Sequence, residues 1–191
     1  MQGAAVKVRE GQKFSGVVAT FSDPGRTAGA YTVLITWDDG HTSAGTVTAT
    51  GHGTYVVTGT NTYAHAGSYA VGVKIGRAGA TATAKGTATV ADAPLWAGRV
   101  FQHVKKGQTT SLLLGTLTDT TPLAAAGDFT LLIDWGDGQK SNGTLKANAR
   151  KTFDISGTHK YTATGSYTLT VTITEKGGQT IAIKPLIAVD A

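Results

Sequence analysis

Four aspartates beside two tryptophans are the first residues able to do chemistry: Asp38 and Asp39 follow Trp37, and Asp134 and Asp137 flank Trp135. A calcium site needs six to eight oxygen ligands at about 2.3–2.6 Å. The chain has 12 acidic residues in 191 and no dense Asp/Asn cluster, although Asp23 and Asp119 could contribute if their loops lie nearby. We therefore predict that Asp39 and Asp137 stabilise turns by accepting backbone hydrogen bonds. Calcium is the weaker alternative, and no other cofactor is expected.

The remaining reactive residue types do not form a known catalytic or zinc motif. The chain has five histidines without His-x-His or His-Glu-x-x-His spacing: His41, His52, His65, His103 and His159. It has no Gly-x-Ser-x-Gly sequence, and it has no cysteine for a thiolate site or a disulfide. We therefore expect no enzymatic activity, and we expect His159 to have a structural role.

The elements that must position these residues have the pattern of β-strands. Apolar residues alternate along two stretches: Tyr31, Val33, Ile35 and Trp37, and again Phe129, Leu131, Ile133 and Trp135. Asp-Gly follows each stretch at 39–40 and 137–138, and this dipeptide favours tight hairpin turns because they require positive φ. About seven strands in ~95 residues, with turns every 8–12 residues and no helical periodicity, predict an all-β sandwich.

The chain contains an internal repeat. Residues 31–93 align with residues 129–191 at an offset of 98, with 23 identities in 63 positions and no gap. Upstream the offset is 96, and the difference falls in the predicted loops 24–30 and 120–128, where insertions are tolerated. We therefore predict two homologous domains, residues 1–93 and 94–191, joined by a short linker around residues 92–97.

Composition excludes several classes of partner. The net charge of +5 is spread over both halves, without the basic face interleaved with aromatic residues that is typical of nucleic-acid binders. No apolar run reaches the ~18–20 residues of a membrane helix, so we expect no membrane insertion. The first residues show no secretion signal, and we expect the chain to be a segment of a longer protein.

Two paired motifs resemble the PKD (polycystic kidney disease) family of immunoglobulin-like domains. The second repeat has Trp-Gly-Asp-Gly at 135–138 and His-x-Tyr-x-x-x-Gly-x-Tyr at 159–167, and the first repeat has the same motifs except that Asp38 and Asn61 replace the first turn Gly and the His. The motif residues are Trp37, Asp39, Gly40, Tyr63, Gly67, Tyr69, Trp135, Asp137, Gly138, His159, Tyr161, Gly165 and Tyr167. The resemblance implies two tandem immunoglobulin-like β-sandwiches.

The same resemblance implies an extracellular role. Domains of this kind serve as spacers, as adhesion modules or as accessory domains of secreted bacterial enzymes. We therefore expect a non-catalytic spacer or stalk repeat of a large bacterial surface or secreted protein, whose partners are neighbouring domains and, in adhesion, a glycan or a surface protein. The alternative is an accessory carbohydrate- or protein-binding module of a secreted hydrolase.

The tryptophans divide into two groups. Trp37 and Trp135 lie in register with apolar strand positions and are predicted to be core residues. Trp96 follows Pro94 and Leu95 in the predicted linker. We expect Trp96 to pack at the junction between the domains, or alternatively to stack on a sugar ring.

Overall fold

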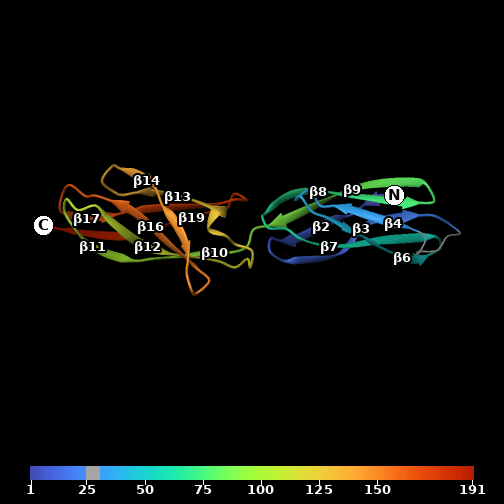
Figure 1. Ribbon diagram of the computed structural model, residues 1–191, viewed down its shortest axis with the longest axis horizontal. Coiled ribbons are helices and arrows are strands. Elements are labelled where there is room, and N and C mark those ends of the chain that lie inside the picture. The colour runs from blue at the N-terminus through green and yellow to red at the C-terminus, as the bar shows by residue number, and fades with distance from the viewer. Residues whose placement is uncertain (25–30) are drawn as a thin grey trace. The chain divides into compact units, whose positions relative to one another are not determined.

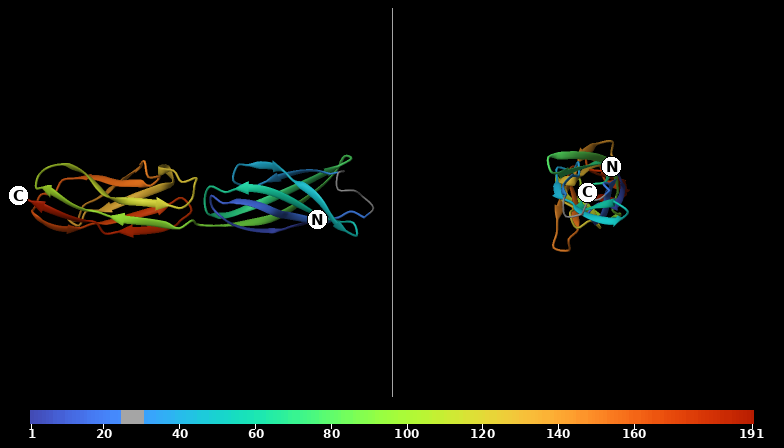
Figure 2. Two further views of the ribbon diagram at one scale, coloured as in Figure 1. Left: turned by 90° about the horizontal axis from the view of Figure 1, so that it is seen from below. Right: turned by 90° about the vertical axis from the view of Figure 1, so that its right-hand side faces the viewer.

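The computed structural model describes residues 1–24 and 31–191, which form two compact units, Met1–Asp92 and Ala93–Ala191 (Figure 1). Most of the predicted loop 24–30 lies outside the described residues. In each unit the strands run lengthwise and the connecting loops gather at the two ends (Figure 2). Among the described residues, no helix has the length and apolar character that crossing a bilayer requires.

The first unit consists of two sheets. One sheet has the order β1 (Gln2–Gly3), β3 (Lys13–Ser22), β7 (Thr54–Thr62) and β6 (Thr46–Gly51). The other has the order β2 (Ala5–Arg9), β9 (Ala80–Ala91), β8 (Gly67–Arg77), β4 (Thr32–Thr36) and β5 (Thr42–Ala44). The first stretch of chain changes sheets, because β1 pairs antiparallel with β3 whereas β2 pairs parallel with β9.

The second unit repeats this topology. Its first sheet has the order β10 (Leu95–Arg99), β12 (Thr110–Asp119), β16 (Phe153–His159) and β15 (Thr144–Ala147). The opposite layer is divided into β14 (Lys140–Asn142), β13 (Phe129–Asp134), β18 (Thr170–Glu175) and β19 (Thr180–Ile183), and into β11 (Phe101–Lys105), β20 (Leu186–Asp190) and β17 (Gly165–Thr168). A 3-10 turn, η2 (Ala126–Asp128), precedes β13.

Pro185 explains why the opposite layer is divided in the second unit. In the first unit Val71 pairs with Gly86 in a continuous ladder between β8 and β9. Strand pairing displaces the last strand by one residue from the sequence alignment, to an offset of 99, since Tyr69 pairs with Ala88 and Tyr167 with Ile187. The corresponding residues are therefore Leu169 and Pro185, and proline has no N–H to donate to a ladder. The Leu169 N–H still donates to the Pro185 carbonyl at 2.9 Å, but regular pairing resumes only at Leu186.

The strand order defines the fold. In each unit a four-stranded sheet faces a second layer of strands, and the first stretch of chain contributes a strand to both. This is the arrangement of the immunoglobulin-like sandwich, so the prediction of two tandem all-β domains is confirmed. The prediction of about seven strands per unit is not confirmed, because the described residues form nine and eleven. In both units the first strand splits and the segment after the Asp-Gly turn forms two short strands, and in the second unit the last two strands are each divided as well, at Leu169 and at Pro185.

Each unit has its own apolar core between its two sheets. The core residues of the first unit include Trp37, Ile35, Val57, Tyr63 and Val71, and those of the second include Trp135, Ile133, Ile155, Tyr161 and Leu169. Alternation places these side chains inward while neighbours such as Thr36 and Thr168 face outward, which is the period-2 pattern of a sheet with one buried face. Each core includes the fully buried tryptophan that directly follows its central strand.

Candidate functional site

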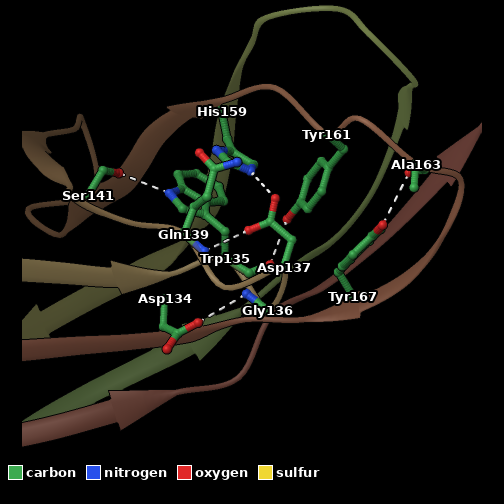
Figure 3. Close-up of polar contacts among 10 residues, drawn as sticks. All are labelled: Asp134, Trp135, Gly136, Asp137, Gln139, Ser141, His159, Tyr161, Ala163 and Tyr167. Carbon is green, nitrogen blue, oxygen red and sulfur yellow. Dashed lines mark hydrogen bonds and ion pairs between the residues drawn. The ribbon is translucent and has the colours of Figure 1, made fainter.

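In the second unit the motif residues gather around Trp135, immediately after β13 (Figure 3). The Trp135 side chain is fully buried, and its Nε1 donates to Ser141 Oγ at 2.9 Å. Its backbone N–H donates to the Gln139 carbonyl at 3.0 Å and closes the turn between β13 and β14. Because a buried indole N–H needs an acceptor, Ser141 completes the burial of this ring.

Asp137 connects the turn to β16 on the opposite sheet. One carboxylate oxygen accepts the Gln139 N–H at 3.0 Å, and the other accepts a hydrogen bond from His159 Nε2 at 2.8 Å (Figure 3). Burial acts to raise the pKa of Asp137, but the His159 and Gln139 hydrogen bonds outweigh it and hold the pKa below its ordinary value. The ionised carboxylate is therefore the form that the folded unit stabilises.

His159 and Tyr161 complete the cluster from the end of β16. The His159 ring stacks on Trp135 with centroids 4.5 Å apart and an interplanar angle of 9°. The Tyr161 hydroxyl donates to the Trp135 carbonyl at 3.1 Å, and its ring stacks on Tyr167, whose hydroxyl donates to the Ala163 carbonyl at 3.2 Å. Burial raises the pKa of Tyr161 well above its ordinary value, so this hydroxyl stays protonated.

The first unit builds the same cluster with a different partner. Trp37 Nε1 donates to Ser43 Oγ at 2.9 Å, and Asp39 accepts the His41 N–H at 3.0 Å. Asn61 stands where the second unit has His159, and its Nδ2 donates to Asp39 Oδ2 at 2.8 Å. Burial acts to raise the pKa of Asp39, but hydrogen bonds from Asn61 and His41 lower it overall. The amide thus preserves the hydrogen bond of the imidazole, without its stacked ring.

The tyrosines of the first unit repeat the ring contact and the hydrogen bond of the second tyrosine, but the Tyr63 hydroxyl, unlike that of Tyr161, has no hydrogen-bond partner among the described residues. Tyr63 and Tyr69 lie with ring centroids 4.5 Å apart, and the Tyr69 hydroxyl donates to the His65 carbonyl at 2.8 Å. Burial raises the pKa of Tyr63 to about 12. Gly67 and Gly165, with φ of 150° and 148°, open the strands that carry Tyr69 and Tyr167. These are the tyrosine corners typical of immunoglobulin-like sandwiches.

Asp38 replaces the turn glycine of the second unit at a conformational cost. Its φ is 62°, in the left-handed region that disfavours residues with a Cβ, whereas its counterpart Gly136 has a φ of 77°. The Asp38 carboxylate compensates by accepting the Ala70 N–H at 2.9 Å. Gly40 and Gly138, with φ of 90° and 88°, occupy the next left-handed position in both turns.

Two further residue pairs complete the cluster without having been assigned a role from the sequence. Ser43 and Ser141 accept the tryptophan N–H groups, and Gly59 and Gly157 lie against the tryptophan rings. A Cβ at either glycine would lie 3.0 Å from a ring carbon of the neighbouring tryptophan and closer still to an isoleucine methyl. Their identity in both repeats was the signal that could have identified them.

The geometry of the aspartates does not fit a cation. Both carboxylate oxygens of Asp39 and of Asp137 accept hydrogen bonds from N–H groups. A cation bound to these oxygens would lie against the positive ends of the same N–H groups instead of against further oxygen ligands. Asp134 accepts the Gly136 N–H and pairs with Lys140 Nζ at 3.1 Å. Asp23 accepts from Tyr31 and Arg77, and Asp119 accepts the Thr121 N–H, so neither joins the motif aspartates through these contacts.

The structure places Trp96 in a strand, which corrects its assignment to a linker. Trp96 belongs to β10 and pairs with Thr118 of β12 within the second unit. Its side chain is 67% exposed on the outer face of that sheet. Residues 92–97 were predicted to be a short linker, but Leu95 already pairs with Asp119 and begins the sheet.

Comparison with known proteins gives likenesses of structure only. No protein family and no curated protein sequence matches the chain. A titin structure (Titin-A168169) is 11% identical, covering 98% of this chain and 95% of that one with a TM-score of 0.46. The ICAM-5 D1–D4 ectodomain fragment is 12% identical, covering 97% of this chain and 51% of that one with a TM-score of 0.44. The Ig1-2 module of the Drosophila receptor protein tyrosine phosphatase DLAR is 12% identical, covering 97% of this chain and 94% of that one with a TM-score of 0.31. Because these TM-scores are all below 0.5, we assign the fold from the strand order and not from these structures.

Proposed function

We propose that the chain is a non-catalytic structural and adhesion module, a pair of spacer or stalk repeats from a large secreted or surface-anchored bacterial protein. One observation carries this proposal. The residues that most resemble a catalytic centre, Trp135, Asp137 and His159, direct their polar atoms at partners within their own unit. These hydrogen bonds fix the hairpin between β13 and β14 and, through Asp137 and His159, join it to the opposite sheet.

Two residue replacements in the first unit also support a structural role for the cluster. This unit replaces the histidine by Asn61 and the turn glycine by Asp38, yet it retains the hydrogen bond to Asp39 and the buried Trp37. A cluster that uses the histidine as a general acid or base would not tolerate the exchange of an imidazole for an amide, because the amide cannot exchange a proton near neutral pH. A structural cluster tolerates it, since both groups donate one hydrogen bond.

A stalk must resist tension, so mechanical unfolding of the tandem chain tests the proposal. Each unit is expected to unfold in one discrete event that lengthens the chain by roughly 300–350 Å, less its folded length, since extended chain spans about 3.3–3.6 Å per residue. Breaking the cluster by Asp39→Ala is expected to lower the force of one of the two events. Gradual extension at low force, without discrete events, would contradict a role in resisting tension.

The alternative is an accessory binding module of a secreted hydrolase, and the exposed Trp96 favours it. A tryptophan 67% exposed on a sheet face offers a flat apolar surface on which a sugar ring can stack. Pull-down on insoluble neutral polysaccharides, comparing the native chain with Trp96→Ala, tests this alternative. Retention that depends on Trp96 would support it, and equal retention of the two proteins would reject it.

A further inference from the structure

The second unit has a notch that the first unit closes. The notch has a volume of about 340 Å³ and is lined by Arg99, Val100, Phe101, Thr168, Lys184 and Leu186. It lies where the chain passes from β10 to β11, beside the interruption between β19 and β20 that contains Pro185. Phe101 pairs with Leu186, and Leu186 pairs with Thr168, so three neighbouring strands form its floor.

The first unit shows why this notch is specific to the second. By strand pairing, Gly3 and Gly86 of the first unit occupy the positions of Arg99 and Pro185. A Cβ at Gly3 would lie 2.2 Å from the Lys85 carbonyl oxygen, and a Cβ at Gly86 would lie 2.2 Å from the Ala4 carbonyl oxygen. The two strands therefore approach each other through glycine contacts that leave no room for side chains.

The side chains of the notch combine an exposed aromatic ring with positive charge. Phe101 is 53% exposed and Leu186 is 38% exposed. Arg99 Nη1 donates to the Lys184 carbonyl at 3.1 Å, which holds the guanidinium over residue 184 and leaves its other N–H groups available. Among the described residues neither Arg99 nor Lys184 forms an ion pair with a carboxylate.

Asp190, which lies on the same strand as Leu186, pairs with His103, and no salt bridge among the described residues joins it to Arg99 or Lys184. The Phe101 ring contacts His103 edge-on at 4.8 Å, and His103 Nδ1 lies 3.3 Å from Asp190 Oδ2. Asp190 is thus engaged by His103, and the six lining residues include no acid. The corresponding residues of the first unit, Ala5 for Phe101 and Thr87 for Leu186, lack both the ring and the apolar partner.

We propose that this notch binds one ring of an anionic polysaccharide, a pyranose that carries a carboxylate or a sulfate. The C–H face of the sugar packs on Phe101 and Leu186, and the anion pairs with the Arg99 fork and the Lys184 ammonium. The volume lies at the small end of ligand sites, which suits a single ring with the polymer continuing into solvent. The site deepens the adhesion part of the proposed function and rests on it.

Binding of the intact chain to four polymers tests this site: oligomannuronate, sulfated dextran, unmodified dextran and poly-glutamate, followed by isothermal calorimetry at physiological salt. We expect one or both anionic sugars to bind and unmodified dextran not to bind; comparing the first two identifies the anion. Equal affinity for poly-glutamate would overturn the proposal in favour of an acidic peptide or a general polyanion effect.

Variants inside and outside the notch separate binding at this site from non-specific attraction of the anionic polymer to the basic chain. Arg99→Gln and Phe101→Ala are each expected to weaken binding by about tenfold or more. Lys85→Gln, the counterpart of Lys184 in the first unit, and Lys146→Gln, on β15, are expected to change binding by less than about twofold. Equal losses in all four variants, or no binding of either anionic sugar, would overturn the site.

Two controls make these results decisive. Phe101 and Arg99 are exposed, so their variants are expected to keep the native melting temperature, and Arg99→Gln tests the site independently if Phe101→Ala does not fold. Failure of sugar binding with discrete mechanical unfolding retained would reject the notch and leave the stalk proposal standing. Loss of discrete unfolding with sugar binding retained would do the reverse.

Discussion

Replacing Asp137 by alanine is the most informative single perturbation of the cluster. The change removes the acceptor of two hydrogen bonds, from His159 Nε2 at 2.8 Å and from the Gln139 N–H at 3.0 Å. It leaves the His159 side chain, which is only 7% exposed, against Trp135 without that acceptor. The His159 bond joins the turn after β13 to the end of β16, and the Gln139 bond lies within the turn, so their loss weakens the contact between the two sheets and the turn that makes it.

The expected cost follows from these contacts. A hydrogen bond to a charged group contributes about 1.5–3 kcal/mol, and one between neutral groups contributes about 0.5–1.5 kcal/mol. The two bonds share one carboxylate and are not additive, so we expect Asp137→Ala to destabilise the second unit by about 2–4 kcal/mol. Asp39→Ala should cost the first unit a similar amount, because Asn61 and His41 supply equivalent donors.

The pH dependence of this effect has a definite sign. The pKa of Asp137 is lower in the folded unit than its ordinary value of 3.8, so the unfolded chain binds the proton more tightly. The stabilisation by Asp137 is therefore complete above about pH 4, and it is lost as the pH falls through the lowered folded pKa. Asp137→Ala should make the acid loss of stability in the second unit shallower.

Native-state hydrogen exchange resolved by peptide measures this effect in each unit separately. A loss of 2–4 kcal/mol corresponds to a rise of roughly 30- to 700-fold in the exchange rates of amides that open only by unfolding of the second unit. Asp190→Ala is the matched control, because its partner His103 is exposed and such pairs contribute little. An Asp137→Ala effect no larger than that of the control would refute the structural role of the cluster.

Three further predictions concern the same cluster. Trp135→Ala should destabilise the second unit by about 3–5 kcal/mol in urea unfolding, because the ring is fully buried, and a loss below about 1 kcal/mol would contradict its core role. Gly136→Ala should cost about 1–3 kcal/mol, because φ is 77° and the new Cβ would lie 2.7 Å from the Thr168 carbonyl oxygen; unchanged thermal stability would refute the requirement for glycine. His159→Asn should keep the bond to Asp137 as Asn61 does and lose only the stacked ring, about 0.5–1.5 kcal/mol by thermal denaturation, and a loss equal to that of His159→Ala would contradict the equivalence of the two groups.

The residue pattern predicted those parts of the fold that depend on local chemistry. Apolar alternation into Trp37 and Trp135 predicted two central strands, and the strand order confirms the tandem immunoglobulin-like sandwich. The Asp-Gly dipeptides suggested turns, and the structure has glycines with positive φ at Gly40 and Gly138. These features are readable because each depends on residues adjacent in the chain.

Features that depend on partners distant in the chain were not predictable in the same way. The division of the second layer depends on Pro185 facing Leu169, and the motif itself does not specify that pairing. Trp96 was assigned to a linker because its partner Thr118 lies 22 positions further along. Asp38 departs from the sequence motif, and the structure shows that the turn accommodates it through a hydrogen bond from the Ala70 N–H to the Asp38 carboxylate.

The coding sequence on both sides of this segment is the most direct test of the stalk proposal. We expect further repeats at the spacing of about 98 residues that separates the two units, each with Trp-x-Asp-Gly followed by Tyr-x-x-x-Gly-x-Tyr, beside a secretion or anchoring signal. A single adjoining catalytic domain with no further repeat would contradict the stalk and make the pair an accessory module of an enzyme.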